Sequence, residues 1–406
     1  MINDMSENNK RKIIPIGPYH PLQEEAEFFK LYIDGETVVD IDIEIGYNHR
    51  GIEQISTMRH YDQIPYTVER ICGICSTSHP FAYVNAVEDL LGIDIPLRAK
   101  CIRSIIGEFE RLHSHLLWLG LAGHFIGYNT VWMWSWKYRE SVCDILELIS
   151  GNRQHYSMFK IGGVRKDIPK DLIPQIEKMC DDLIPAIDMF KGAVMDDPVI
   201  HARLKGVGVL TKEDAINFCV LGPTARASGI DIDVRRDDPQ QNSTAYGLVE
   251  FKVPVFNNGD VFDKAVIRIL EMYESIKIIK QCLMMLKKEP EGNIETKVDF
   301  IPAGEGVGHY EAPRGEVFHY IRSDGSNRPI RHKIRAPSYM NVASNKVAAV
   351  GQSISDAALT LAAVDPCYCC TERTIVVDIG SKNIVYTWND LIKLSQQKTE
   401  KIKKLL

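Results

Sequence analysis

The sequence predicts an α+β protein that is predominantly helical, with a small N-terminal antiparallel sheet packed on a large helical bundle. Apolar residues recur at spacings of three and four over long stretches, which is the period of a buried helix face. One early segment, residues 28–45, instead alternates partly between apolar and polar residues and is rich in β-branched side chains, as a pair of strands requires. No internal repeat is visible, and no change in composition marks a flexible linker between domains.

The expected elements follow in chain order. Residues 1–13 are polar and are predicted to form a disordered tail, whereas residues 28–45 form a hairpin with Asp34-Gly35 at its turn. The first long helix is expected from about residue 98 to residue 126, where the apolar face consists of Ile102, Ile105, Ile106, Phe109, Leu112 and Leu116. Further helices are expected over residues 137–150, 171–193, 260–287 and 341–363. Loops rich in Gly, Pro and Asp are expected over residues 222–239 and 302–315.

Composition excludes several classes of protein. The chain has 406 residues, of which 45% are hydrophobic and 25% are charged, as in ordinary globular proteins. Its net charge of −6 argues against a nucleic-acid partner, which usually requires a basic surface. No apolar run reaches the roughly 18 residues of a membrane-spanning helix, and the polar N-terminus does not resemble a signal peptide. We therefore expect a cytoplasmic protein that reaches a membrane only through partners.

Ten cysteines are too few for a disulfide scaffold in a chain of this length. Five of them are scattered singly and are expected to be small buried apolar side chains: Cys101, Cys143, Cys180, Cys219 and Cys282. The others gather in two short segments. Cys72 and Cys75 form one C-x-x-C pair, and Cys367, Cys369 and Cys370 form a cluster that contains a second.

Two C-x-x-C turns can together supply four thiolates to one metal. Adjacent Cys369 and Cys370 cannot easily point into the same site, so the spacing selects Cys367 and Cys370 and leaves Cys369 as a neighbouring thiol. Because 292 residues separate Cys75 from Cys367, the site closes at the centre of the fold, which suits catalysis better than a local zinc staple. Spacing alone leaves zinc, an iron–sulfur cluster and another transition metal open.

Seven separated motifs resemble those of one family and occur in the family's order. Three resemble nickel–iron hydrogenase large subunits, in their two cysteine motifs and in the loop that places an arginine over the metal: ERICGICSTSH (69–79), DPCYCCTER (365–373) and EAPRG (311–315). Four resemble the 49-kDa-type subunit of respiratory complex I: GPYHP (17–21), IGYNHRGIE (45–53), SGNRQHYSMFKIGGVRKD (150–167) and the segment 206–239. The combination is similar to the membrane-bound, energy-converting branch that includes the hydrogenase subunit of formate hydrogenlyase. The complex I relatives have lost the metal cysteines, whereas this chain keeps all four.

The resemblance implies a catalytic subunit that reduces protons to H2 reversibly, coupled to ion translocation by membrane subunits. Nickel would be held by Cys72, Cys75, Cys367 and Cys370, and Cys75 and Cys370 would also bridge to an iron that carries CO and cyanide. The chain has no spare set of four cysteines for an iron–sulfur cluster of its own. Electrons would therefore pass through a small partner subunit with a 4Fe–4S cluster.

The same resemblance assigns roles to residues around the metal. Arg314, after Pro313, would face the metal cavity, and Asp365 would pair with an arginine nearby. His79 would donate a hydrogen bond to a cysteine sulfur, and Glu25, or its neighbour Glu24, would transfer protons.

Glu53 resembles a ligand of a structural magnesium or iron near the C-terminus of other hydrogenases. The partner ligand there is a terminal histidine, and Arg373 takes its place in this chain. A Glu53–arginine ion pair is therefore expected in place of that metal.

The resemblance also implies the domain plan and the partners. Residues 14–373 form one domain, with a sheet-containing part over 14–65 and a helical body with the metal site over 66–373. Residues 374–406 form an extension that a maturation protease removes after nickel-insertion proteins have acted. Further implied partners are a 30-kDa-type subunit, a ferredoxin-like subunit and antiporter-like membrane subunits, which would hold the chain on the inner face of the cell membrane.

Two alternatives stay open. The chain could be a non-hydrogenase relative of the 49-kDa subunit that reduces quinones or sulfur compounds, or a structural subunit stabilised by zinc. The metal content of the purified protein distinguishes them.

Overall fold

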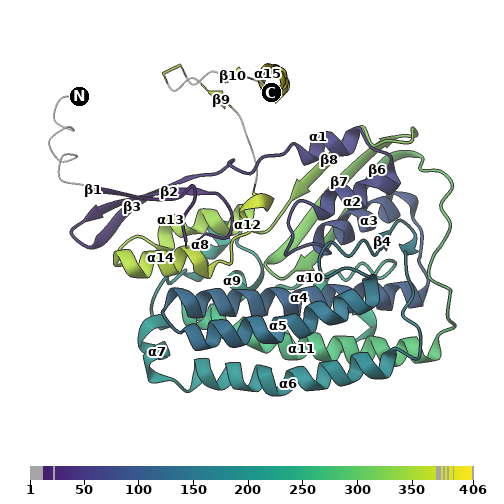
Figure 1. Cartoon of the computed structure of the whole chain (residues 1–406), viewed down its shortest axis with the longest axis horizontal. Helices are drawn as coiled ribbons and strands as arrows, with labels where there is room; N and C mark the ends of the chain where they lie inside the picture. Colours follow the sequence, from purple (N-terminus) through teal and green to yellow (C-terminus); the bar gives the residue numbers. More distant parts are fainter. Residues whose placement is uncertain are drawn as a thin grey trace.

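The computed structural model describes residues 12–21, 23–371, 376–377, 380–381, 384–386 and 388–404. Four long helices lie side by side along one side of the molecule, and two small antiparallel sheets lie above them (Figure 1). The predicted class, a predominantly helical α+β fold with a small N-terminal antiparallel sheet, is confirmed.

The four long helices follow the predicted apolar periods. They are α4 (Leu97–Phe125), α5 (Asn129–Ser150), α6 (Ile173–Met195) and α11 (Val261–Lys288). Helix α4 is buried along most of its length and packs against α5 and α11. No helix in the described part of the chain is both long and apolar enough to cross a membrane.

The N-terminal sheet consists of β1 (Lys12–Ile16), β2 (Phe28–Asp34) and β3 (Thr37–Glu44) in the order β1-β2-β3. Its buried face, with Phe29 and Leu31, packs on α13 (Asn345–Ala348) and α14 (Ile354–Ala363), which connect it to the long helices. Strand β1 begins at Lys12, inside the segment predicted to be a tail, and residues 1–11 lie outside the described residues. The sheet thus lies next to the segment that carries the second cysteine pair.

A second antiparallel sheet was not predicted. It consists of β6 (Ala303–Ala312), β7 (Gly315–Asp324) and β8 (Arg331–Arg335). The prediction of a loop over residues 302–315 is therefore wrong. The glycines that suggested a loop instead allow β6 to lie against the backbone of α3 (Ser78–Leu91).

Gly308 provides a test of this packing. A Cβ atom there would lie 2.2 Å from both the Ala82 carbonyl oxygen and the Ala86 nitrogen. Both are backbone atoms of α3, so the helix itself would have to shift. We expect Gly308→Ala to lower the free energy of unfolding by about 3 kcal/mol or more, as severe overpacking does. Gly304→Ala, on the same strand, is the matched control, because its Cβ would meet only Leu90 Cγ at 3.7 Å. Equal denaturation midpoints for the two variants would contradict this account.

Short elements connect these layers. They are α1 (Ile52–Thr57), α2 (Ile64–Glu69), β4 (Phe159–Lys160), β5 (Gly163–Val164), α7 (Pro198–Leu204), α8 (Lys212–Asn217), α9 (Gly222–Ala227), α10 (Val234–Asp237) and α12 (Ser338–Asn341). The loop predicted over 222–239 therefore contains two short helices, and the single helix predicted over 341–363 is broken between α13 and α14.

Cys219 is exposed, in contrast to the prediction, whereas the other four scattered cysteines are buried.

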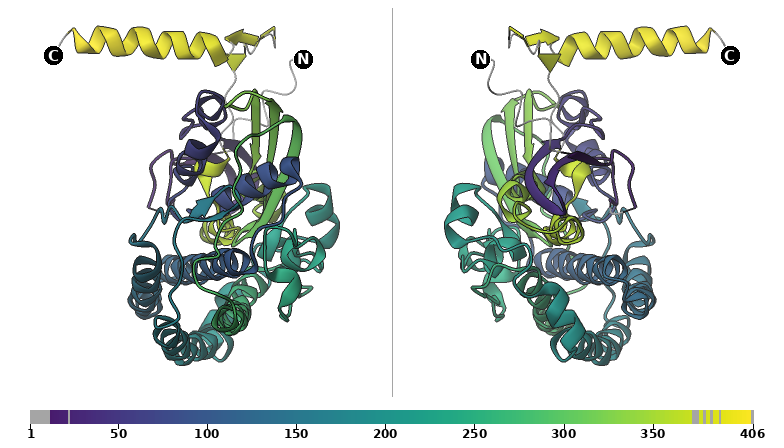
Figure 2. Two further views of the ribbon diagram at one scale, coloured as in Figure 1. Left: turned by 90° about the vertical axis from the view of Figure 1, so that its right-hand side faces the viewer. Right: turned by 90° about the vertical axis from the view of Figure 1, so that its left-hand side faces the viewer.

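The described C-terminal elements are β9 (Val376–Val377), β10 (Ile384–Tyr386) and α15 (Trp388–Lys403). Helix α15 stands clear of the body in both views of Figure 2.

Candidate metal centre

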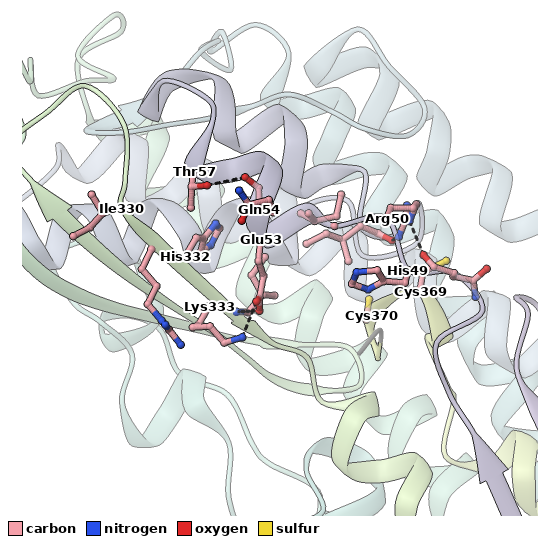
Figure 3. Close-up of a pocket in the computed structure, with 16 residues that line it drawn as sticks. His49, Arg50, Glu53, Gln54, Thr57, Ile330, His332, Lys333, Cys369 and Cys370 are labelled. Atoms are coloured by element: carbon pink, nitrogen blue, oxygen red, sulfur yellow. Dashed lines mark hydrogen bonds and ion pairs between the residues drawn. The ribbon is translucent and has the colours of Figure 1, made fainter. Parts of the chain in front are cut away.

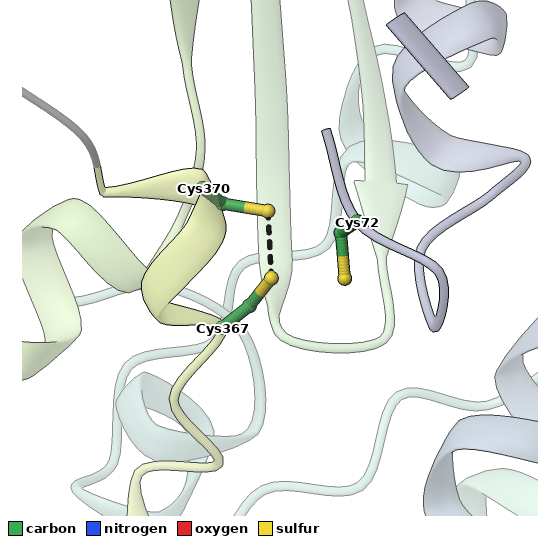
Figure 4. Close-up of side chains that lie close together, drawn as sticks. All are labelled: Cys72, Cys367 and Cys370. Carbon is green, nitrogen blue, oxygen red and sulfur yellow. Dashed lines mark hydrogen bonds between the residues drawn. The ribbon is translucent and has the colours of Figure 1, made fainter. Parts of the chain in front are cut away.

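The two C-x-x-C pairs meet between the sheets and the long helices. Cys72 follows α2, and Cys75 lies in the turn before α3. Cys367 and Cys370 lie on a single 3₁₀ turn after α14. The sulfur atoms of Cys72, Cys367 and Cys370 lie within 4.8 Å of one another, and those of Cys367 and Cys370 are 2.7 Å apart (Figure 4).

Cys75 completes the set from the same turn as Cys72. Its backbone N–H donates to the Cys72 sulfur at 3.4 Å, and its own sulfur accepts from Arg314 Nη1 at 3.6 Å. Cys369 behaves differently, because it is half-buried and its backbone N–H donates to Glu25 Oε2 at 2.5 Å. The geometry thus favours Cys72, Cys75, Cys367 and Cys370 as the ligand set and leaves Cys369 beside it.

The electrostatics of the four thiols fit a metal ion. Hydrogen bonds from Cys367, Cys370 and Cys75 hold the pKa of Cys72 well below its usual range. Burial raises the pKa of Cys367 and Cys370, and the neighbouring thiols add to the shift. A soft cation among the sulfurs would stabilise all four thiolates together, which is the usual role of such a donor set.

Arg314 lies over the cysteines at the turn between β6 and β7, directly after Pro313. Its guanidinium is buried and pairs with Asp365 at 2.6 Å, while Nη1 donates to Ser114 Oγ at 2.9 Å. Asp365 has a left-handed backbone with φ of 57°, a costly conformation for a residue other than glycine. The Arg314–Asp365 pair connects the turn to the second cysteine segment, and its burial excludes a surface salt bridge.

Close backbone packing holds this turn in place. A Cβ atom on Gly222 would lie 2.4 Å from the Arg314 carbonyl oxygen, and one on Gly315 would lie 2.7 Å from the Gly222 nitrogen. The Asn341 side chain donates to the same Arg314 oxygen at 3.1 Å. Ser114 and Asn341 were not singled out in the sequence, because neither belongs to a motif and both are distant from residue 314 along the chain.

His79, near the start of α3, lies beside the second cysteine pair. Its Nε2 lies 3.4 Å from the Cys370 sulfur, and its Nδ1 lies 3.1 Å from His319 Nε2. Burial lowers the pKa of His79 to about 4, so the ring is neutral near pH 7. His319 was not predicted as a site residue.

Glu24 and Glu25 lie beside the cysteines, in the segment before β2. Burial raises the pKa of Glu25 to about 7, and the nearby Cys72 charge adds to the shift. Burial raises the pKa of Glu24 further, to about 8, although its side chain is more exposed than that of Glu25. Glu25 contacts the cysteine segment directly through Cys369 and is therefore the better placed of the two to exchange protons with the centre.

Glu53, at the start of α1, lies beside the centre in a cavity of about 420 Å³ (Figure 3). It pairs with Lys333 at 2.6 Å and accepts a hydrogen bond from the Ile334 nitrogen at 3.0 Å. Lys333 is a partner that the sequence did not suggest. The predicted arginine partner, Arg373, lies outside the described residues.

Comparisons with known proteins agree with the geometry. Residues 126–301 and 294–373 match the 49-kDa subunit of respiratory-chain NADH dehydrogenase, and residues 50–121 match nickel-dependent hydrogenase. The membrane-bound hydrogenase subunit alpha of Pyrococcus furiosus is 43% identical over 96% of this chain and 93% of its own length. Formate hydrogenlyase subunit 5 of Escherichia coli is 35% identical over 94% of this chain and 66% of its own length.

A solved structure has the same fold. A chain of the membrane-bound sulfane sulfur reductase, an archaeal respiratory membrane complex, superimposes with a TM-score of 0.85 at 29% identity, over 90% of this chain and 99% of its own. The chain therefore belongs to the family that unites nickel–iron hydrogenase large subunits with the 49-kDa subunit of respiratory complex I, in its membrane-bound, energy-converting branch.

Proposed function

We propose that this chain is the catalytic large subunit of a membrane-associated nickel–iron hydrogenase that reduces protons to H2 reversibly. The convergence of buried cysteine thiols beneath Arg314 carries the proposal. Three of the four sulfurs lie within 4.8 Å of one another, and the fourth, on Cys75, is hydrogen-bonded with Cys72 and Cys367. A quinone or sulfur-compound reductase of this fold has no evident need for four converging thiols, and a zinc staple has no need for an arginine aimed at its sulfurs.

The ligand set and its surroundings suit this chemistry. A nickel–iron centre with CO and cyanide on iron, held by Cys72, Cys75, Cys367 and Cys370 with Cys75 and Cys370 as bridges, would supply the open metal position at which H2 is formed or split. Arg314 donates to the Cys75 sulfur and places a positive charge beside that position, and Asp365 holds the guanidinium in its orientation. Glu25, with its pKa raised to about 7, can accept and return a proton at its carboxyl group at little cost in free energy.

Electrons would enter through a partner subunit with a 4Fe–4S cluster. Two loops beside the centre, which are joined by a hydrogen bond from the Asn48 side chain to the Ala26 carbonyl at 2.8 Å, expose Tyr19 and Tyr47. Exposed tyrosines are typical of interfaces.

We include in the proposal the 30-kDa-type, ferredoxin-like and antiporter-like subunits, a position on the cytoplasmic face of the membrane, and coupling to ion translocation.

Metal analysis with infrared spectroscopy of the purified complex tests the function. We expect one nickel per chain, with iron, and CO and cyanide stretching bands in a region that protein leaves nearly empty. Stoichiometric zinc without these bands would instead identify a zinc-stabilised structural subunit. A complex free of bound metal but active on quinones or sulfur compounds would identify a non-hydrogenase relative.

The C-terminal segment gives a separate prediction. Helix α15 stands clear of the body (Figure 2). We propose that residues 374–406 are removed after Arg373 once nickel has been inserted. Intact-mass measurement of the active subunit should therefore give a chain ending at Arg373. A nickel-loaded, active chain that still ends at Leu406 would rule out obligatory processing.

A further inference from the structure

Three buried histidines form a continuous hydrogen-bonded chain that begins at the metal centre. His79 Nε2 lies 3.4 Å from the Cys370 sulfur, and His79 Nδ1 lies 3.1 Å from His319 Nε2. His319 Nδ1 in turn lies 2.9 Å from Nε2 of His332. The three rings come from α3, β7 and β8, so the second sheet supplies two of them.

All three rings are buried, with no more than 2% of any of them exposed. Burial disfavours a charged imidazolium, so each ring is neutral. A neutral imidazole carries one N–H donor and one nitrogen acceptor. The direction of one hydrogen bond in the chain therefore determines the direction of the others.

The end at Cys370 sets that direction. A metal-bound thiolate can only accept, so His79 must donate from Nε2 and accept at Nδ1. His319 must then donate from Nε2 and accept at Nδ1, and His332 must donate from Nε2. Any other arrangement places two lone pairs or two N–H groups against each other.

The far end of the chain lies at the cavity beside Glu53. His332 lines that cavity, and its Nδ1 is buried without a hydrogen-bond partner among the described residues. Figure 3 shows His332, Glu53 and Lys333 on one side of the cavity and Cys369 and Cys370 on the other. In the direction derived above, Nδ1 carries a lone pair and leaves no N–H group without an acceptor.

We propose that His319 and His332 are positioning residues that hold His79 in the tautomer that donates to the Cys370 sulfur, and that they connect this sulfur to the cavity beside Glu53. The inference rests on the proposed nickel–iron centre. Since hydrogen bonds in a chain polarise one another, each histidine strengthens the final bond to sulfur. That bond withdraws electron density from a thiolate that would bridge to iron.

Infrared spectroscopy of the holo-complex tests the chain through a readout other than activity. His319→Phe leaves Nδ1 of His79 without a hydrogen-bond donor. His332→Phe leaves Nδ1 of His319 without a donor, one hydrogen bond further from the Cys370 sulfur. We expect the CO band to move to lower wavenumber in both variants at unchanged nickel content, with the larger shift for His319→Phe. His332→Gln, whose amide N–H can donate in place of the imidazole, should return the band close to its wild-type position.

His309→Phe is the matched control, because His309 lies on β6 of the same sheet but pairs with Glu316 and Asp238, away from the chain. The CO band of the His309→Phe complex should stay at its wild-type wavenumber. If His319→Phe fails to assemble, His332→Phe alone decides the question. Unshifted bands in an assembled His332→Phe complex would overturn this inference while leaving the proposed function intact. A wild-type complex without nickel and without the bands would overturn the proposed function and this inference with it.

Discussion

Replacing Cys72, Cys75, Cys367 or Cys370 by serine should in each case abolish both nickel retention and hydrogen evolution. Three of the four sulfurs lie within 4.8 Å of one another and the Cys75 sulfur contacts two of them, all in a buried space. A hydroxyl there can neither ionise as a thiolate does nor bind a soft metal comparably. Loss of one ligand also leaves the other three thiols in contact without the cation that would stabilise their charges. The measurements are nickel content by elemental analysis and hydrogen evolution by the purified complex.

Cys369→Ser is the matched control for these variants. Cys369 is adjacent to Cys370 but contacts Glu25 through its backbone N–H, which serine retains. Most of the nickel should stay bound. Loss of nickel from Cys369→Ser together with its retention in Cys370→Ser would show that the ligand assignment is wrong.

Replacing Glu25 by glutamine should lower turnover by about 10²- to 10⁴-fold with the metal centre intact, the range that loss of a proton-transfer group usually costs. The amide keeps the size of the side chain, but it cannot carry the exchangeable proton that a carboxyl group with its pKa near 7 can carry. The measurement is hydrogen–deuterium exchange activity at matched nickel content.

Glu24→Gln is the control, since Glu24 is more exposed than Glu25 and lacks the hydrogen bond that joins Glu25 to the Cys369 nitrogen. A small effect is expected there. Unchanged activity in both single variants and in the double variant would exclude this acidic pair as the proton route.

The long helices could be predicted closely because their signal is local. Apolar residues at spacings of three and four predicted a helix over 98–126, and α4 spans Leu97–Phe125. The break between α13 and α14 has a distant cause instead. The Gly351 nitrogen and the Gln352 carbonyl oxygen both pair with Val38 of β3, an arrangement that a continuous helix would not allow.

The second sheet was missed for a similar reason. Glycine lowers strand propensity, and three alternate glycines in β6 made the segment resemble a loop. Two of them, Gly306 and Gly308, are required by the close approach of α3, a helix more than 200 residues earlier in the chain. Propensity describes a residue and its neighbours and contains no information about such an approach.

The sequence by itself identified the family through its motifs, and it predicted the four-cysteine set and Arg314, because the C-x-x-C spacing is a local geometric requirement. Only the tertiary structure decided what surrounds that set. The pairing of Arg314 with Asp365 and Ser114, the contact of Glu25 with the Cys369 nitrogen, and the chain from His79 through His319 to His332 join residues up to 344 positions apart. Their roles arise from the directions of hydrogen bonds in a buried space, and those directions exist only once the helices and both sheets have packed around the cysteines.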